Sequence, residues 1–208
     1  MRRAALGLLA ALLGAGAAPA ATVAEEAAVR ANFAGLKGAL AKRDAAALLG
    51  LASGDSRAYC QELLALAGRG SSEELARLEA SDRLAVLALR REVPPEVLRA
   101  GDCAGFLRHA LGRSAPDPAA LAGAELRGFE SSDGRARGLL ALGGVPTPWV
   151  LAFAQTRGAW RLDARSSLEL TARLLLLPAR LAGVPEDRLV DVLLDAGTSG
   201  GEKRAGER

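Results

Sequence analysis

Histidine, cysteine and large aromatic residues are scarce in this sequence. Its 208 residues include one histidine, His109, and two cysteines, Cys60 and Cys103. One histidine argues against most hydrolytic metal sites, and a closed zinc site needs four ligands. The sequence also lacks a Gly-x-Ser-x-Gly elbow, a phosphate-binding glycine loop and a dinucleotide-binding glycine pattern. It therefore predicts no metal or cofactor and identifies no reaction.

A surplus of charge is also missing. The chain has 27 basic and 24 acidic residues, which become 25 and 24 once Arg2 and Arg3 leave with the leader described below. Binding to nucleic acid or to an anionic membrane favours a clustered basic face rather than a small surplus. We therefore expect no nucleic-acid partner. The basic residues are almost all arginine, which together with abundant alanine, glycine and leucine is typical of a G+C-rich genome.

The first residues are typical of a secretory signal peptide. Arg2 and Arg3 form a basic start, and about 15 uncharged residues follow from Ala4 to Ala18, fewer than the ~20 that span a bilayer. Ala18-Pro19-Ala20 fits the small-x-small pattern that signal peptidase accepts. We predict cleavage after Ala20 and an exported protein, periplasmic or secreted, with no stable membrane span after cleavage. An uncleaved anchoring helix is the alternative, which the three glycines of the run disfavour.

The rest of the chain has the length of one domain, on the usual scale of about 100–200 residues each. We predict a single α+β domain over residues 21–196. Its first half is helical, and a four-stranded antiparallel meander with C-terminal helices follows. Residues 197–208 are polar and have no hydrophobic face to bury, which predicts a disordered tail.

Helical periodicity and capping residues define the first half. Apolar residues recur at helical spacing, Asp44 and Asp102 are placed to cap helices, and Ser71 with Glu74 has the spacing of a capping box. Ser81-Asp82 is expected to interrupt the helix that begins at Ser71. The predicted helices cover residues 24–41, 44–51, 56–67, 71–91, a short segment from 95, and 103–111.

Short segments without the helical period follow after residue 112 and predict strands. Asp133-Gly134 and Arg157-Gly158 are tight-turn signals, and residues 143–148 are expected to form a longer turn. The predicted strands cover residues 125–129, 135–142, 149–155 and 159–163. One C-terminal helix is expected over residues 166–177, and another from Pro185.

The third strand alternates between two apolar faces. Trp149, Leu151 and Phe153 point one way, and the residues between them are also apolar. This pattern predicts a central strand that is covered on both sides. Trp160 is expected on the inner face of the sheet, buried beside Trp149 or Phe153. The chain has few aromatic rings, so we expect a large ring to fill the core rather than lie on the outer surface.

The two cysteines are an even number in a chain predicted to be exported. An oxidising compartment permits a disulfide between Cys60 and Cys103 if the two predicted helices approach within roughly 7 Å at the Cα atoms. We predict this bond; two buried free thiols are the alternative.

The hairpin Gly158-Ala159-Trp160-Arg161-Leu162-Asp163 resembles the closing hairpin of the nuclear transport factor 2-like superfamily. Residues 33–44, followed by a short second helix, resemble the first helix of its exported bacterial members. The resemblance covers both ends of the domain and leaves out the long helical segment of residues 56–111. It implies an open cone, in which a curved antiparallel sheet wraps around helices. The His/Asp pair that enzymes of this superfamily place inside the cone has no match here.

Two functions follow from these observations. The first is a non-enzymatic exported domain that binds a small apolar ligand or an envelope protein through the concave sheet face, with Trp149, Phe153 and Trp160 as binding residues. A homodimer through that face is left open. The alternative is a hydratase or isomerase with Asp163 or His109 as general base.

Overall fold

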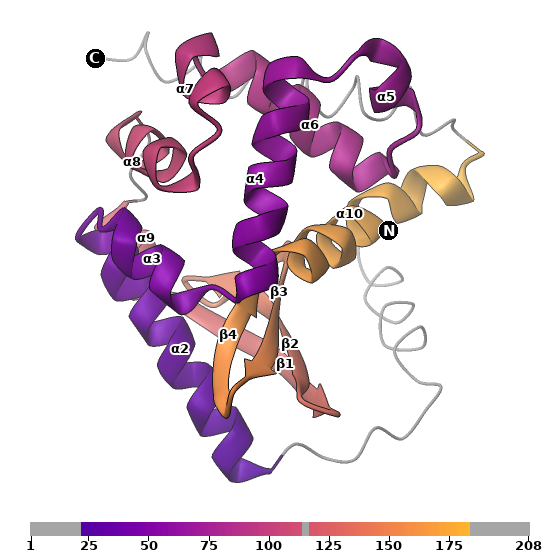
Figure 1. Cartoon of the computed structure of the whole chain (residues 1–208). Helices are drawn as coiled ribbons and strands as arrows, with labels where there is room; N and C mark the ends of the chain where they lie inside the picture. Colours follow the sequence, from indigo (N-terminus) through magenta and orange to yellow (C-terminus); the bar gives the residue numbers. More distant parts are fainter. Residues whose placement is uncertain (1–21, 114–116, 184–208) are drawn as a thin grey trace, which may run out of the picture.

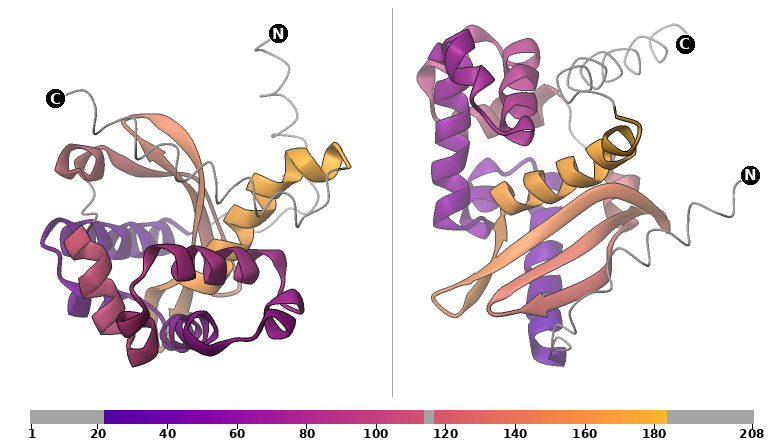
Figure 2. Two further views of the ribbon diagram at one scale, coloured as in Figure 1. Left: turned by 90° about the horizontal axis from the view of Figure 1, so that it is seen from above. Right: turned by 90° about the vertical axis from the view of Figure 1, so that its right-hand side faces the viewer.

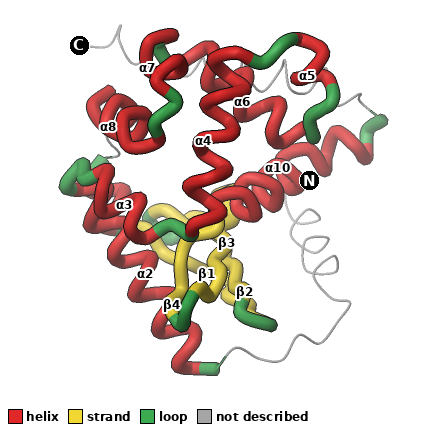
Figure 3. The backbone as a smooth tube through the Cα atoms, viewed as in Figure 1, coloured by secondary structure: helices red, strands yellow, loops and turns green. Residues whose placement is uncertain are grey.

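The computed structural model describes residues 22–113 and 117–183. It shows helices first, then a four-stranded antiparallel sheet, then a C-terminal helix (Figure 1; Figure 3). The predicted α+β fold class is thereby confirmed. The predicted signal peptide, both domain limits, the helix expected from Pro185 and the polar tail lie outside the described residues.

The capping residues start the helices where the sequence places them. The Asp44 carboxylate accepts a hydrogen bond from the Ala47 amide at 2.9 Å, and Ser71 and Glu74 form the predicted capping box. The helices are α2 (Val23–Ala41), α3 (Ala45–Leu51), α4 (Gly54–Arg69), α5 (Ser72–Ala76), α6 (Ala80–Glu92), α7 (Pro95–Ala100), α8 (Cys103–Arg113), α9 (Pro118–Ala122) and α10 (Ala164–Leu181).

One helical prediction was wrong, and one helix was missed. The interruption falls between α5 and α6, at residues 77–79, and Ser81 and Asp82 lie in the first turn of α6. Serine and aspartate are favourable near a helix start, so the residues that we expected to break a helix mark the beginning of one. The short helix α9 was not predicted, although Asp117 caps it and Pro118 occupies its first position.

The sheet is a meander in the order β1-β2-β3-β4, with every pair antiparallel. Its strands are β1 (Ala124–Ser132), β2 (Arg135–Leu142), β3 (Val145–Thr156) and β4 (Ala159–Asp163). All three connections are two-residue turns in which both residues have positive φ, the geometry of type I′ hairpins. They are Asp133-Gly134, Gly143-Gly144 and Arg157-Gly158.

The longer turn expected over residues 143–148 is wrong. Gly143 and Gly144 make the turn alone, and β3 begins at Val145. Pro146 and Pro148 lie in the part of β3 that β4 does not reach, because the pairing with β4 begins only at Ala152. A proline, which has no N–H to donate, is tolerated on the side of a strand that has no strand neighbour.

Helix α10 takes the place beside β3 that β4 leaves. The Thr171 hydroxyl accepts a hydrogen bond from the Val150 amide at 3.0 Å, and the Ser167 hydroxyl accepts one from the Ala152 amide at 2.8 Å. Two side chains of a helix therefore bond backbone groups of β3 that a longer β4 would otherwise pair. Thr171 is 2% exposed, so this contact is buried.

Helix α2 packs on one face of the sheet and forms a core with it. Phe33 of α2 lies in one buried cluster with Phe153 and Trp160, which are 1% and 6% exposed. The buried side chain of Asn32 donates to the Trp160 carbonyl at 2.9 Å and so ties α2 to β4. The burial predicted for Trp160 beside Phe153 is confirmed. Trp149 is 51% exposed instead, and it lies within the irregular stretch of the pairing between β2 and β3.

The outer edge of the sheet, β1, also meets α2. The Lys37 ammonium donates to the Ala124 carbonyl at 3.0 Å, and the Arg30 guanidinium donates to the Leu126 carbonyl at 3.3 Å.

Helices α4 to α8 gather at the opposite end of the molecule, and α10 lies between them and the sheet (Figure 2). The protein therefore has a sheet end and a helical end.

Candidate functional site

The residues predicted to bind a ligand do not form one open surface. Phe153 and Trp160 lie in the core beneath α2, whereas Trp149 is half exposed. Helix α2 covers the inner sheet face on which these rings were expected to meet a ligand. A binding role for the three rings stays a prediction.

His109 and Asp163, the two candidate bases, line different pockets. The Asp163 carboxylate accepts hydrogen bonds from the Ser166 amide at 3.1 Å and the Ser166 hydroxyl at 2.8 Å, which is how a residue caps the start of a helix, here α10. His109 lies on α8, and its Nε2 atom is buried without a hydrogen-bond partner. The structure does not bring the two together, and general-base catalysis by either one stays a prediction.

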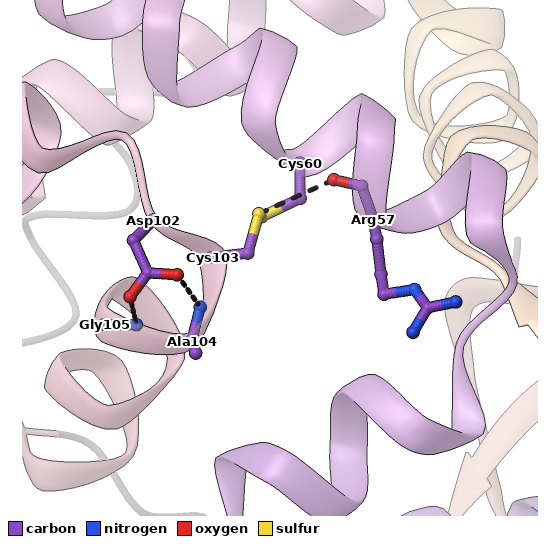
Figure 4. Close-up of a disulfide and its surroundings, with 6 residues drawn as sticks. All are labelled: Arg57, Cys60, Asp102, Cys103, Ala104 and Gly105. Carbon is purple, nitrogen blue, oxygen red and sulfur yellow. Dashed lines mark hydrogen bonds between the residues drawn. A yellow bond between two sulfur atoms is a disulfide. The ribbon is translucent and has the colours of Figure 1, made fainter.

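The predicted disulfide is present between α4 and α8. Cys60 and Cys103 are bonded, with their Cα atoms 6.1 Å apart. Beside the bond, the Asp102 carboxylate caps α8 by accepting from the Ala104 amide at 3.1 Å and the Gly105 amide at 2.8 Å (Figure 4). The covalent link and the cap fix the start of α8 against α4. A disulfide of this kind is typical of an oxidising, extracytoplasmic environment.

A cavity of about 560 Å³ lies beside this link, between α4, α6 and α8, with the first turns of α10 at one side. We call it the helical cavity. Most of its wall is apolar: the larger side chains are Leu63, Leu64, Leu89, Val93, Phe106 and Leu168, and Cys60 of the disulfide also contributes. Ala85, Ala88 and Ala110 line it as well. These short side chains leave the space between the helices unfilled.

The polar groups along the cavity wall are mostly satisfied by the protein itself. The Tyr59 hydroxyl donates to the Asp82 carboxylate at 2.5 Å, and burial, reinforced by this bond, raises the pKa of the Tyr59 phenol above its ordinary value. Ser56 donates to the Leu162 carbonyl at 2.9 Å and accepts from the Ala164 amide at 2.8 Å. These hydroxyls are neutral and already bonded, so the interior presents mainly hydrocarbon.

Charge is confined to the exposed margin of the cavity. Glu92 and Arg113 are both exposed, and the Arg113 guanidinium donates to the Glu92 carbonyl at 2.8 Å. The cavity has the size of small-molecule sites, about 300–1,000 Å³, and their usual composition of apolar walls with few polar groups. It can hold a small apolar molecule.

Sequence reasoning missed this cavity. Ala85, Ala88 and Leu89 recur at the spacing of one helix face, and small residues on a face that also carries leucine are a signal of unfilled volume. That signal is visible in the sequence. The unfilled volume becomes a cavity because α8 lies opposite α6, and that position depends on long-range contacts.

No protein-family model, curated protein or solved structure matches this chain. Within residues 22–113 and 117–183, no group of three or more His, Cys, Asp and Glu side chains could hold a metal ion. The helices in the same part of the chain are all too short or too polar to cross a membrane. The resemblance to the nuclear transport factor 2-like superfamily stays a prediction.

Proposed function

We propose that this protein is an exported, non-enzymatic binding protein for a small apolar ligand, and that the ligand occupies the helical cavity. The proposal keeps the ligand class expected from the sequence and moves its site from the sheet to the helices. The observation that supports it is the apolar cavity of about 560 Å³. Cys60 of the disulfide lies in the wall of this cavity.

Burial of hydrocarbon supplies the binding energy. Each square ångström of apolar surface removed from water contributes about 25 cal/mol, and the walls offer few polar groups that a ligand would have to satisfy. The disulfide contributes by holding α8 against α4, so the cavity needs little ordering when the ligand enters. Affinity then depends on how well the ligand fills the volume.

Filling the cavity with a side chain tests the proposal. The neutral apolar dye N-phenylnaphthylamine, which fluoresces strongly in apolar surroundings, would be titrated into the mature protein. Ala88 lines the cavity from α6, so we expect Ala88→Trp to abolish most of the dye binding while the protein stays folded. Ala58, which is exposed on α4, provides the matched control. Ala58→Trp should bind the dye like the unchanged protein.

Two outcomes would contradict the proposal. Dye binding that survives in Ala88→Trp would place the dye at another surface. No binding by the unchanged protein, for the dye or for a panel of envelope lipids and apolar metabolites in thermal-shift measurements, would remove the ligand altogether.

A further inference from the structure

Three arginines from separate parts of the chain converge on one cleft at the sheet end. The cleft has a volume of about 420 Å³ and lies between the start of α4 and the turn that joins β3 to β4. Arg57 comes from α4, Arg157 from the turn and Arg161 from β4. No acidic side chain of the described residues lines it. We call it the arginine cleft.

One of these arginines is held in place by the backbone. The Arg161 guanidinium donates from one nitrogen to the Gly50 carbonyl at 2.5 Å, across more than one hundred residues of sequence. This bond fixes the side chain at the cleft and leaves the remaining donors of its planar group. A guanidinium with fixed orientation loses little freedom when it binds a second partner.

The position of Arg157 in its turn is unfavourable for an arginine. Its φ is 52°, in the left-handed region where Gly, Asn and Asp are preferred. The turn between β1 and β2 has the same geometry and carries the favoured residue, Asp133, with φ 51°. One hairpin turn thus carries the favoured residue Asp133, and the other carries Arg157, which lines the cleft.

The charges at the cleft are of one sign. The first turn of α4 begins at Gly54, which lines the cleft and adds the positive end of a 16-residue helix to the three guanidinium groups. Asp55, in the same turn, is exposed and does not line the cleft. Gathering like charges costs free energy, and an anion bound among them offsets that cost.

We propose that the arginine cleft binds a small anion with a phosphate or sulfate group. Arginine pairs with such tetrahedral anions through two parallel N–H···O bonds, and three guanidinium groups can surround one group of this kind. The cleft lies apart from the helical cavity and shares only the helix α4 with it, through different residues. The anion site is therefore independent of the apolar ligand.

Titration with pyrophosphate and inorganic phosphate at low ionic strength tests this site, by calorimetry and by amide chemical shifts of Gly54 and Gly158. We expect Arg57→Gln to weaken pyrophosphate binding about tenfold or more, since a hydrogen bond to a charged group is lost with the charge. Arg69, exposed at the far end of α4, gives the matched control. Arg69→Gln removes the same charge and should leave the affinity within about twofold.

A second variant separates binding from folding. Arg157→Asn places a favoured residue in the turn, so the melting temperature should stay or rise by about 1–3 °C while anion affinity falls about tenfold. Loss of stability together with affinity would mean that Arg157 serves the turn and not an anion. Equal weakening by Arg57→Gln and Arg69→Gln, or no shift of the two glycine amides, would overturn the proposal.

Discussion

The two ends of the molecule bury different side chains. The sheet end packs α2 against the strands around Phe33, Phe153 and Trp160, three of the seven aromatic rings of the chain. The helical end is built mainly from leucine, valine and alanine. Its buried ring is Tyr59, and Phe106 is only partly buried. Both ends have hydrogen bonds between side chains and backbone, such as Asn32 to Trp160 and Arg90 to Ala67, but only the helical end has a disulfide.

The difference shows how scarce aromatic volume is divided. Rings fill the space between a helix and a sheet, where a wide gap separates the backbones. Short aliphatic side chains let helices approach but fill the space between them incompletely, and the cavity beside Ala85 and Ala88 results. The disulfide adds stability at the end where the side chains fill the interior less completely. Stability at one end comes from packing, and at the other partly from a crosslink.

The largest effect is expected from removing the central ring of the sheet end. Trp160→Ala leaves a cavity that neighbouring leucines and alanines cannot fill, and should lower the free energy of unfolding by about 3–5 kcal/mol. Chemical denaturation monitored by circular dichroism measures it. Trp149→Ala, at the half-exposed tryptophan, is the control and should cost less than about 1 kcal/mol. An unchanged unfolding curve for Trp160→Ala would place Trp160 outside the core.

Removing the crosslink is the corresponding test of the helical end. Cys60→Ala with Cys103→Ala opens a link between residues 43 apart in sequence and should lower stability by about 2–4 kcal/mol. Dye binding in the helical cavity should weaken too, because α8 is no longer fixed to α4. Non-reducing mass spectrometry of the unchanged protein, produced in an oxidising compartment, should find no thiol that can be alkylated. Two reactive thiols would contradict the bond.

A smaller effect is expected where α10 replaces a strand. Thr171→Val keeps the shape of the buried side chain but leaves the Val150 amide without its acceptor, which should cost about 1–3 kcal/mol. Thr156→Val, at an exposed position near the end of β3, is the matched control. Equal stabilities of the two variants would show that the hydroxyl contact does not support the fold.

The smallest effect concerns Tyr59, the only tyrosine of the chain. Its pKa is raised in the folded state above the ordinary value of 10.0, so folding favours the neutral phenol. The resulting stability is present below about pH 10 and is lost as the pH rises above it. Tyrosinate absorbance should therefore appear only as the protein unfolds. Tyr59→Phe removes the hydrogen bond to Asp82 and should lower the free energy of unfolding by about 1 kcal/mol at neutral pH. The stability of this variant should not fall further at alkaline pH through this residue. Tyrosinate forming in the folded protein at ordinary pH values for tyrosine would refute the burial.

Local rules account for what the sequence predicted correctly. Asp44, Asp102 and the pair Ser71 and Glu74 act within one helical turn, so their effects are readable from neighbouring residues. The turn Asp133-Gly134 is local in the same way. The disulfide was predicted only because two cysteines allow a single pairing.

What the sequence did not predict depends on contacts between distant residues. Trp149 continues the alternation of Phe153, yet the irregular pairing near Leu139 leaves it half exposed. The prolines after Gly144 suggested a loop. They are acceptable in β3 because β4 is too short to pair with that part of the strand, and the residues around the prolines do not indicate where β4 ends. Both candidate sites combine elements far apart in the chain, so no residue spacing in the sequence predicted them.

The protection of both sheet edges has a consequence for how this protein behaves at high concentration. An open strand edge is a template on which another chain can add a strand and begin aggregation. Here Lys37 and Arg30 occupy carbonyls of the edge strand β1, and Asn32 and Ser56 occupy carbonyls of the other edge strand, β4. Ser167 and Thr171 occupy amides of β3 where β4 ends. Each edge thus carries side chains of the same molecule, two of them charged, where an intermolecular ladder would start. A sheet capped in this way resists growth into fibrils while the chain remains folded.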